Sequence, residues 1–175
     1  TDTIIRQVGD IGRLVDEFSA FARMPAPIIK PEDIVKLTRN STILFENAHR
    51  NISFFSDFGA KSVLISCDAR QVGQALTNLL QNAVDAIEGR RASGLRVDEP
   101  GLIEINIVAK EDLATVSVRD NGKGLPDDER RDRLTEPYVT TREKGTGLGL
   151  AIVRKIMEDH GGDLKLTDHP DGGAV

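Results

Sequence analysis

The chain has 175 residues, of which 39% are hydrophobic, 29% are charged and only 4% are aromatic. This balance is typical of a soluble globular chain and excludes disordered and collagen-like sequences. A folded chain of this length removes roughly 70% of its unfolded surface from water, which is enough for one core without disulfides.

The charge balance also excludes several classes of partner. Twenty-three basic against 28 acidic residues give a net charge of −5, so no overall positive field attracts nucleic acid or an anionic membrane. No apolar run approaches the ~20 residues of a membrane helix, and the single Cys67 has no partner for an internal disulfide. The chain opens at Thr1 without a methionine, so we expect a piece of a longer parent.

Residues 1–23 carry apolar side chains at alternating steps of four and three, the spacing of a helix that packs lengthwise on another helix. Two interpretations stay open: an amphipathic helix lying on its own domain, or the seam of an intermolecular bundle. Pro25 and Pro27 end this helix because proline lacks the amide donor, so we expect a linker over residues 24–31. The apolar positions are Ile4, Val8, Ile11, Val15, Phe18 and Ala22.

The next segments predict helices and strands in an irregular order. An apolar stripe after Asp33 predicts a helix to about Asn51. Two β-prone runs, residues 52–58 and 62–66, are separated by turn-forming residues and predict a strand pair. Asp68 is suited to cap a second, long helix. The apolar stripe that would form the buried face of this helix is Val72, Leu76, Leu79, Ala83 and Ile87.

The second half of the chain continues this mixture. Residues 89–101 are polar and predict a loop, and alternation over residues 103–118 predicts an antiparallel hairpin. A third helix is expected over residues 148–160, ended by a glycine pair, and residues 163–167 begin a strand pair that the chain end cuts off. This order predicts an α+β fold: a two-layer α/β sandwich with helices on one face of a mixed sheet.

A polar stripe runs along the second predicted helix, where Gln71, Gln74, Asn78, Asn82 and Asp85 recur at steps of three and four. Asparagine is unfavourable in a helix interior, which indicates a functional use. Amide and carboxylate oxygens can complete the oxygen shell of Mg²⁺. The alternative is an ordinary solvated helix face.

The segment Asp120-Asn121-Gly122-Lys123-Gly124 directly follows a predicted strand. A carboxylate at a strand end can accept a hydrogen bond from an exocyclic amine, and glycines let the backbone approach a ligand closely. Asn-Gly is also a common hairpin turn, although the following Lys-Gly-Leu-Pro does not suit a return strand.

Residues 140–150, Thr-Thr-Arg-Glu-Lys-Gly-Thr-Gly-Leu-Gly-Leu, form a basic, glycine-rich loop that runs straight into a helix. The amides and the positive end of the helix dipole then face any anion at the helix start, which predicts a phosphate cradle. The segment matches neither a Walker A loop nor a dinucleotide-binding fingerprint.

Taken in this order, the three clusters resemble the ATP-binding domain of sensor histidine kinases, in the superfamily shared with gyrase, the ninety-kilodalton heat-shock chaperone and mismatch-repair ATPases. Residues 22–25 and 135–141 further resemble the NtrY-like branch of nitrogen regulation. The resemblance covers about residues 32–175 and four motifs: an N box (Asn78–Ala83), a first glycine box (Asp120–Gly124), an F box (Glu136–Tyr138) and a second glycine box (Gly145–Leu150).

The resemblance implies a Bergerat-type sandwich over residues 32–175, with its C-terminal strand truncated. Residues 1–23 would be the second helix of a dimerisation and phosphoacceptor hairpin, and residues 24–31 the linker. The implied activity is that of a protein-histidine kinase, which transfers the γ-phosphoryl group of Mg-ATP to a histidine for relay to a response-regulator aspartate. Because the acceptor helix is missing, we do not expect this piece to phosphorylate itself.

The implied partners are the phosphoacceptor helix of the same protein, a response-regulator receiver domain and a second copy in a full-length homodimer. We expect no contact of these residues with nucleic acid or membrane. The implied location is cytoplasmic, either free or as part of a membrane-anchored sensor.

The resemblance also assigns roles to single residues. Asn82 would hold Mg²⁺, Asp120 would accept from the adenine amine, and Asn78, Arg142 and Lys144 would act in catalysis. The expected nucleotide-binding set is Asn82, Asp85, Asp120, Gly122, Gly124, Tyr138, Thr140, Thr141, Gly145, Thr146, Gly147, Leu148 and Gly149.

Three positions depart from the pattern of the relatives. Asn78 stands where hydrolysing relatives have a glutamate, and an amide cannot take a proton from water, so fast hydrolysis is not expected. Asp85 stands where many sensor kinases have a lysine, and Ala174 where hydrolysing relatives have a threonine. The alternatives are another branch of the superfamily, a protein-serine kinase or conformational ATPase, and a non-catalytic dimerisation or nucleotide-sensing module.

Overall fold

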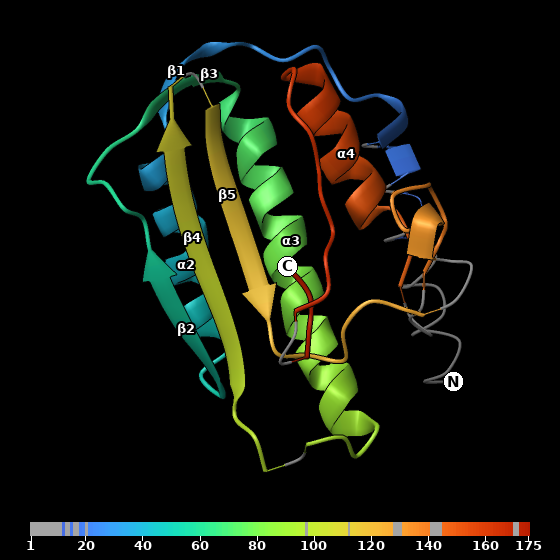
Figure 1. Ribbon diagram of the computed structural model, residues 1–175. Coiled ribbons are helices and arrows are strands. Elements are labelled where there is room, and N and C mark those ends of the chain that lie inside the picture. Colours follow the sequence, from blue (N-terminus) through green and yellow to red (C-terminus); the bar gives the residue numbers. More distant parts are fainter. Residues whose placement is uncertain are drawn as a thin grey trace.

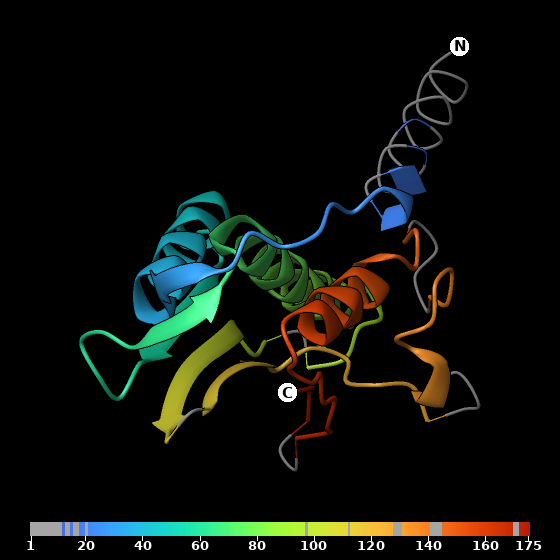
Figure 2. The same cartoon turned by 90° about the horizontal axis from the view of Figure 1, so that it is seen from above.

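The computed structural model (Figures 1 and 2) describes most of the chain after the first helix. Its helices α2 (Ile34–Ala48), α3 (Ala69–Ala92) and α4 (Gly149–Asp159) form one layer and its strands the other, which is clearest in Figure 2. The predicted two-layer arrangement is therefore confirmed. The described residues are 12, 15, 18–19, 21–96, 98–111, 113–127, 131–140, 145–169 and 172–175.

Nine elements follow one another in this part of the chain. Strand β1 precedes the first long helix, and the strands β4 and β5 form the predicted hairpin between α3 and α4. The elements are β1 (Lys30–Asp33), α2 (Ile34–Ala48), β2 (Ile52–Asp57), β3 (Leu64–Cys67), α3 (Ala69–Ala92), β4 (Gly101–Lys110), β5 (Leu113–Asp120), a short 3₁₀ turn (Arg131–Arg133) and α4 (Gly149–Asp159).

The strands form two sheets. In the larger one the order is β2-β4-β5, with β2 parallel to β4 and β4 antiparallel to β5. The smaller sheet pairs β1 with β3 in antiparallel fashion. The predicted pairing of residues 52–58 with residues 62–66 is therefore wrong, because the chain leaves the larger sheet after β2. Val63 instead contacts the start of α2: its amide donates to Asp33 Oδ1, and its carbonyl accepts from Ile34.

Strand β1 begins inside the expected linker and continues to Asp33, so only residues 24–29 of the linker are irregular. Proline at position 31 is tolerated because β1 is an edge strand, where a missing amide need not break a ladder. Two helix boundaries also differ from expectation. Helix α2 ends at Ala48 rather than Asn51, and α3 continues to Ala92, so the loop predicted from residue 89 starts later.

The core of the larger sheet is the apolar face of α3 against β4. Ile103 and Ile105 of β4 are fully buried, as are Val84 and Ile87 of α3. Each such side chain contributes about 1.5–3 kcal/mol by its removal from water. The alternating burial along β4 and the three-and-four spacing along α3 are the patterns from which both elements were predicted.

A separate apolar cluster fixes α4 on α3. Its buried members come from both helices and from the residue before α4, and Phe21 and Met24 pack against it from the N-terminal segment. The direction of α4, and with it the position of the glycine-rich segment that precedes it, is therefore set by packing. The buried members are Ala75, Leu148, Ile152, Val153 and Ile156.

The two ends of the chain match the predictions in part. Gly12, Val15, Phe18 and Ser19 are helical, whereas Ile4, Val8 and Ile11 lie outside the described residues. As far as the described residues show, the expected C-terminal strand pair is reduced to one bridge between Asp168 and Ala174, flanked by two hydrogen bonds that Thr167 and Val175 exchange. None of the helices in the described part of the chain has the length and apolar character needed to cross a bilayer.

Asp68 joins three segments at the start of α3. Its Oδ1 accepts from the amides of Arg70 and Gln71, and its Oδ2 accepts from the Ile28 amide of the linker at 2.9 Å. Its own amide donates to His160 Nε2 at the end of α4. The Ile28 hydrogen bond in particular holds the pKa of the Asp68 carboxyl below its ordinary value, against the opposing effect of burial.

We expect Asp68→Ala to lower the free energy of unfolding by about 2 kcal/mol at pH 7, since the cap and the linker contact are lost together. Because the folded pKa lies below the unfolded one, the charge contributes fully above about pH 4 and its contribution is lost as pH falls through the folded pKa. Asp68→Asn is the matched control that keeps one acceptor. Urea unfolding between pH 7 and pH 3 should show a weaker pH dependence for both variants, and an unchanged dependence would contradict the assignment.

Candidate functional site

The polar stripe of α3 meets the start of α4. Asn78 Nδ2 donates to the carbonyl of Gly149 at 3.3 Å. A Cβ atom placed on Gly149 would lie 3.8 Å from Asn82 Oδ1, so a second amide of the stripe lies against the same residue. Leu148, the residue that caps α4, has no side-chain acceptor for the first amides of this helix. Two amide side chains and a positive helix end are thus brought together.

The segment after β5 packs on α3 one turn beyond Asn82. A Cβ atom on Gly122 would lie 2.5 Å from the backbone carbon of Ala86, a distance that real Cβ atoms do not show. The amide of Lys123 donates to the Ala86 carbonyl at 3.2 Å. Glycine at position 122 is therefore required by close backbone packing, and it places Asp120 beside the N-box helix.

Asp120 itself is 7% exposed at the end of β5. Its Oδ1 accepts from the Gly122 amide at 2.8 Å, and its own amide donates to the carbonyl of Ala174 at 2.9 Å. The C-terminal segment, red in Figure 1, runs back alongside β5 to make this contact. The structure thus places position 174, where hydrolysing relatives have a threonine, next to Asp120.

The F box meets the second glycine box through backbone atoms. The Tyr138 amide donates to the Gly147 carbonyl at 3.0 Å, and both residues have positive φ, +68° and +70°. The Tyr138 ring is 55% exposed and stacks on Phe18 with centroids 6.3 Å apart. The ring expected at the nucleotide therefore contacts the N-terminal helix, whereas the backbone of Tyr138 positions the glycine segment.

The remaining predicted residues are spread around this centre. Asp85 accepts from Gln81 Nε2 at 2.8 Å on the exposed side of α3. Leu148 is fully buried between α3 and α4, which is a packing position rather than a contact surface. Gly124 has a positive φ of +78°, and Thr140, Gly145 and Thr146 are half-buried, with Thr146 Oγ1 accepting from the Leu148 amide. Thr141, Arg142 and Lys144 lie outside the described residues.

Sequence reasoning missed Arg90, whose guanidinium is fully buried and donates to the carbonyl of Asn121 at 2.9 Å. The sequence does contain a signal that could have identified Arg90. Arg90 follows Ala83 and Ile87 on the apolar stripe of α3 at steps of four and three, where a charged side chain has to be paired.

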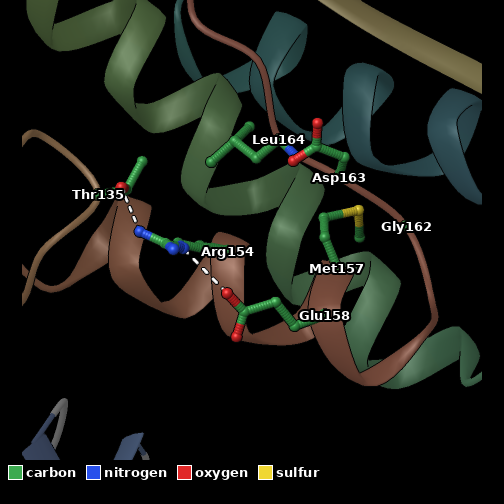
Figure 3. A pocket seen from close by; sticks show the side chains of 7 residues that line it. All are labelled: Thr135, Arg154, Met157, Glu158, Gly162, Asp163 and Leu164. Carbon is green, nitrogen blue, oxygen red and sulfur yellow. Dashed lines mark hydrogen bonds and ion pairs between the residues drawn. The ribbon is translucent and has the colours of Figure 1, made fainter. Parts of the chain in front are cut away.

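Two other features lie apart from this centre. A pocket of about 290 Å³ beside α4 is lined by Met157 and Leu164 and by Arg154, which bonds Thr135 and Glu158 (Figure 3). Burial, with the charges of Glu32 and Asp68, raises the pKa of the Cys67 thiol, which therefore does not suit a nucleophile.

In the described ranges no three His, Cys, Asp or Glu side chains group as a metal site.

Comparison with known proteins agrees with this arrangement. A profile of the family described as "Histidine kinase-, DNA gyrase B-, and HSP90-like ATPase" matches residues 67–175. Nitrogen regulation protein NtrY of Azorhizobium caulinodans is 51% identical over 175 residues, which cover 98% of this chain and 22% of that protein. The chain thus spans less than a quarter of this relative.

Solved structures with the same fold include the catalytic domain of histidine kinase ThkA, with a TM-score of 0.70 and 30% identity over 83% of this chain and 91% of that one. ThkA in complex with the response regulator protein TrrA matches with a TM-score of 0.76 and 25% identity over 99% of this chain and 48% of that one. The family inferred from the four motifs is confirmed. The chain belongs to the histidine kinase-, DNA gyrase B- and HSP90-like ATPases, as a histidine kinase ATP-binding catalytic domain that is similar to part of NtrY.

Proposed function

We propose that this domain binds Mg-ATP between α3, the Asp120 segment and the start of α4, and passes the γ-phosphoryl group to a histidine on a helix outside this sequence. A response-regulator aspartate then receives the group. The observation that carries the proposal is the convergence on one stretch of α3: Asn78 and Asn82 meet Gly149, and Ala86 meets Gly122 one turn later.

The Asp120 side of this centre suits adenine. A carboxylate that is almost fully buried, and oriented by the Gly122 amide, is an acceptor for an exocyclic amine. Guanine presents a carbonyl oxygen at the same place and would be repelled. Asp120 is therefore the residue that selects ATP over GTP.

The α4 side suits a triphosphate and its metal ion. The missing side chain of Gly149 leaves space beside Asn82 Oδ1, and an amide oxygen is a ligand of the kind that Mg²⁺ accepts alongside phosphate oxygens and water. Asn82 would hold the ion, whose charge neutralises the triphosphate when bound. Asn78 bonds the Gly149 carbonyl and so fixes the start of α4, whose amides favour an anion.

The acceptor histidine has to come from elsewhere in the parent. His49 ends α2 and stacks on Phe45, and His169 bonds Arg119. His160 ends α4 and bonds both Asp68 and Ile156. All three have a structural role. Val15 is 52% exposed and Phe18 is 44% exposed, which fits residues 1–23 as one helix of a dimerisation hairpin in a homodimeric kinase. We place this kinase in the cytoplasm, either free or as part of a membrane-anchored sensor.

The proposal is tested in two steps on the purified domain. Calorimetric titration should show binding of Mg-ATP, and addition of a purified acceptor-helix fragment with labelled ATP should give an acid-labile, base-stable phosphoprotein. An acid-stable product would favour a protein-serine kinase, and no binding at millimolar Mg-ATP would favour a non-catalytic module. Either result would overturn the proposed reaction.

The role of Asn82 gives a separate prediction. Asn82→Ala should weaken Mg-ATP about 10-fold or more, because a metal ligand is lost, and should change the affinity for ATP in EDTA less than about 2-fold. Gln74→Ala, which removes another amide of the same stripe, is the control and should leave both affinities unchanged. Equal losses with and without the ion would remove Asn82 as the ligand.

A further inference from the structure

A buried charged network joins the end of α3 to the segment that carries Asp120. Its centre is Arg90, the largest fully buried side chain in the described part of the chain. Arg90 Nη1 donates to the Asn121 carbonyl at 2.9 Å, and Nη2 donates to the Glu99 carbonyl at 2.7 Å. Nη1 also pairs with Glu99 Oε2 at 3.2 Å.

The same segment is held from two further directions. Asn121 Nδ2 donates to Glu99 Oε1 at 3.1 Å and to the Pro100 carbonyl at 2.9 Å. Arg96 Nη2 donates to the Gly122 carbonyl at 3.2 Å, and Arg96 Nη1 pairs with Glu99 Oε2 at 3.3 Å. Glu99 thus links both arginines and Asn121, and together they fix the backbone of residues 121–122.

This network acts on Asp120 through a single peptide group. The Asn121 carbonyl and the Gly122 amide belong to the same planar unit. Arg90 bonds the oxygen of this unit, and the nitrogen of the unit donates to Asp120 Oδ1 at 2.8 Å. The guanidinium therefore sets the plane of the peptide that orients the carboxylate, and its charge polarises that peptide toward the carboxylate.

Stability alone is a poor explanation for this arginine. Removing a guanidinium from water is costly, and an apolar side chain of similar volume often stabilises a core as well or better. Among the described residues, Arg90 Nε has no hydrogen-bond partner, so even the paired charge is not fully satisfied. The position of Arg90 on an apolar helix face is therefore better explained by a need to orient the 121–122 peptide than by a gain in stability.

We propose that Arg90 is a positioning residue for base recognition: it fixes the 121–122 peptide and thereby aims the Asp120 carboxylate at the exocyclic amine of adenine. The inference rests on the proposed function, in which Asp120 reads the base. Glu99 is its partner in this role, because it fixes the position of the guanidinium from the solvent side.

The test compares ATP with purine riboside triphosphate, which lacks the exocyclic amine, by calorimetry on the whole domain. Arg90→Lys keeps the charge but cannot make both guanidinium hydrogen bonds, to the Asn121 and Glu99 carbonyls. It should reduce the preference for ATP over the amine-free nucleotide about 10-fold. Arg91→Lys is the matched control, since Arg91 is the neighbouring residue and bonds the Asn51 carbonyl at the surface. It should keep the wild-type preference.

A merely structural Arg90 would lower the melting temperature and weaken both nucleotides equally, so an unchanged ratio overturns the inference. If Arg90→Lys does not fold, Glu99→Ala decides, because this side chain is 41% exposed and its loss should be tolerated. The ratio should then fall about 3-fold, and a wild-type ratio overturns the inference. If the wild-type domain binds ATP no better than the amine-free nucleotide, the adenine role of Asp120 and this inference are overturned together. If the wild type prefers ATP and Arg90→Lys keeps the same preference, only the inference is overturned.

Discussion

Replacing Asp120 with asparagine should weaken ATP about 100-fold without weakening GTP, because the new amide can donate to the guanine carbonyl oxygen that the carboxylate repels. The asparagine Oδ1 can still accept from the Gly122 amide, a bond of 2.8 Å in the present structure. The amide nitrogen then takes the place of the second carboxylate oxygen and presents a donor to a donor on the base. Because Asp120 is almost fully buried, water has little access to compensate for this mismatch.

The chain offers a closely matched control for this variant. Asp57, at the exposed end of β2, accepts from the amide of Gly59 at 3.1 Å in the same Asp-x-Gly arrangement. Asp57→Asn therefore repeats the local chemical change at a distance from the proposed site and should leave both affinities unaltered. The measurement is calorimetric titration of both variants with Mg-ATP and Mg-GTP, and a wild-type ATP preference in Asp120→Asn would remove Asp120 as the base-reading residue.

The elements that could be predicted from sequence are those whose periodicity directly reflects one buried face. Ile103 and Ile105 alternate with half-buried residues in β4, and the α3 stripe continues through Val84 and Ile87. β1 had no such signal, since four residues that include Pro31 owe their strand conformation to pairing with β3. Pairing between distant segments depends on tertiary contacts, and the same reason explains the wrong partner assigned to β2.

The proposed site divides in a similar way. The motif positions could be read from sequence because glycines and helix-interior asparagines are unusual where they stand. The contacts between motifs could not be predicted from sequence, because the contact of Gly122 with Ala86 and the stacking of Tyr138 on Phe18 arise only from packing. Arg90 is intermediate: its place on the apolar stripe was visible, but its partner was not.

Gly147→Ala should have the second large effect, and it acts through the backbone alone. Gly147 has a φ of +70°, and a Cβ atom there would lie 2.6 Å from the backbone carbon of Tyr138. The backbone would have to move, breaking the Tyr138 bond to the Gly147 carbonyl and shifting Gly149 away from Asn82. We expect a loss of about 3 kcal/mol in the free energy of unfolding and a loss of Mg-ATP affinity of more than about 10-fold.

Gly161→Ala separates the clash from the conformational cost. Gly161 has nearly the same φ, +68°, but within the described structure no atom that an added Cβ would meet lies within 4 Å. This control should lose only about 1 kcal/mol and should keep the wild-type nucleotide affinity. Thermal unfolding and Mg-ATP titration of both variants measure the difference. Similar losses in the two variants would show that left-handed backbone strain, and not the close approach of Gly147 to Tyr138, accounts for the effect of Gly147→Ala. The Gly147 contact would then have no part in holding α4 against the N box.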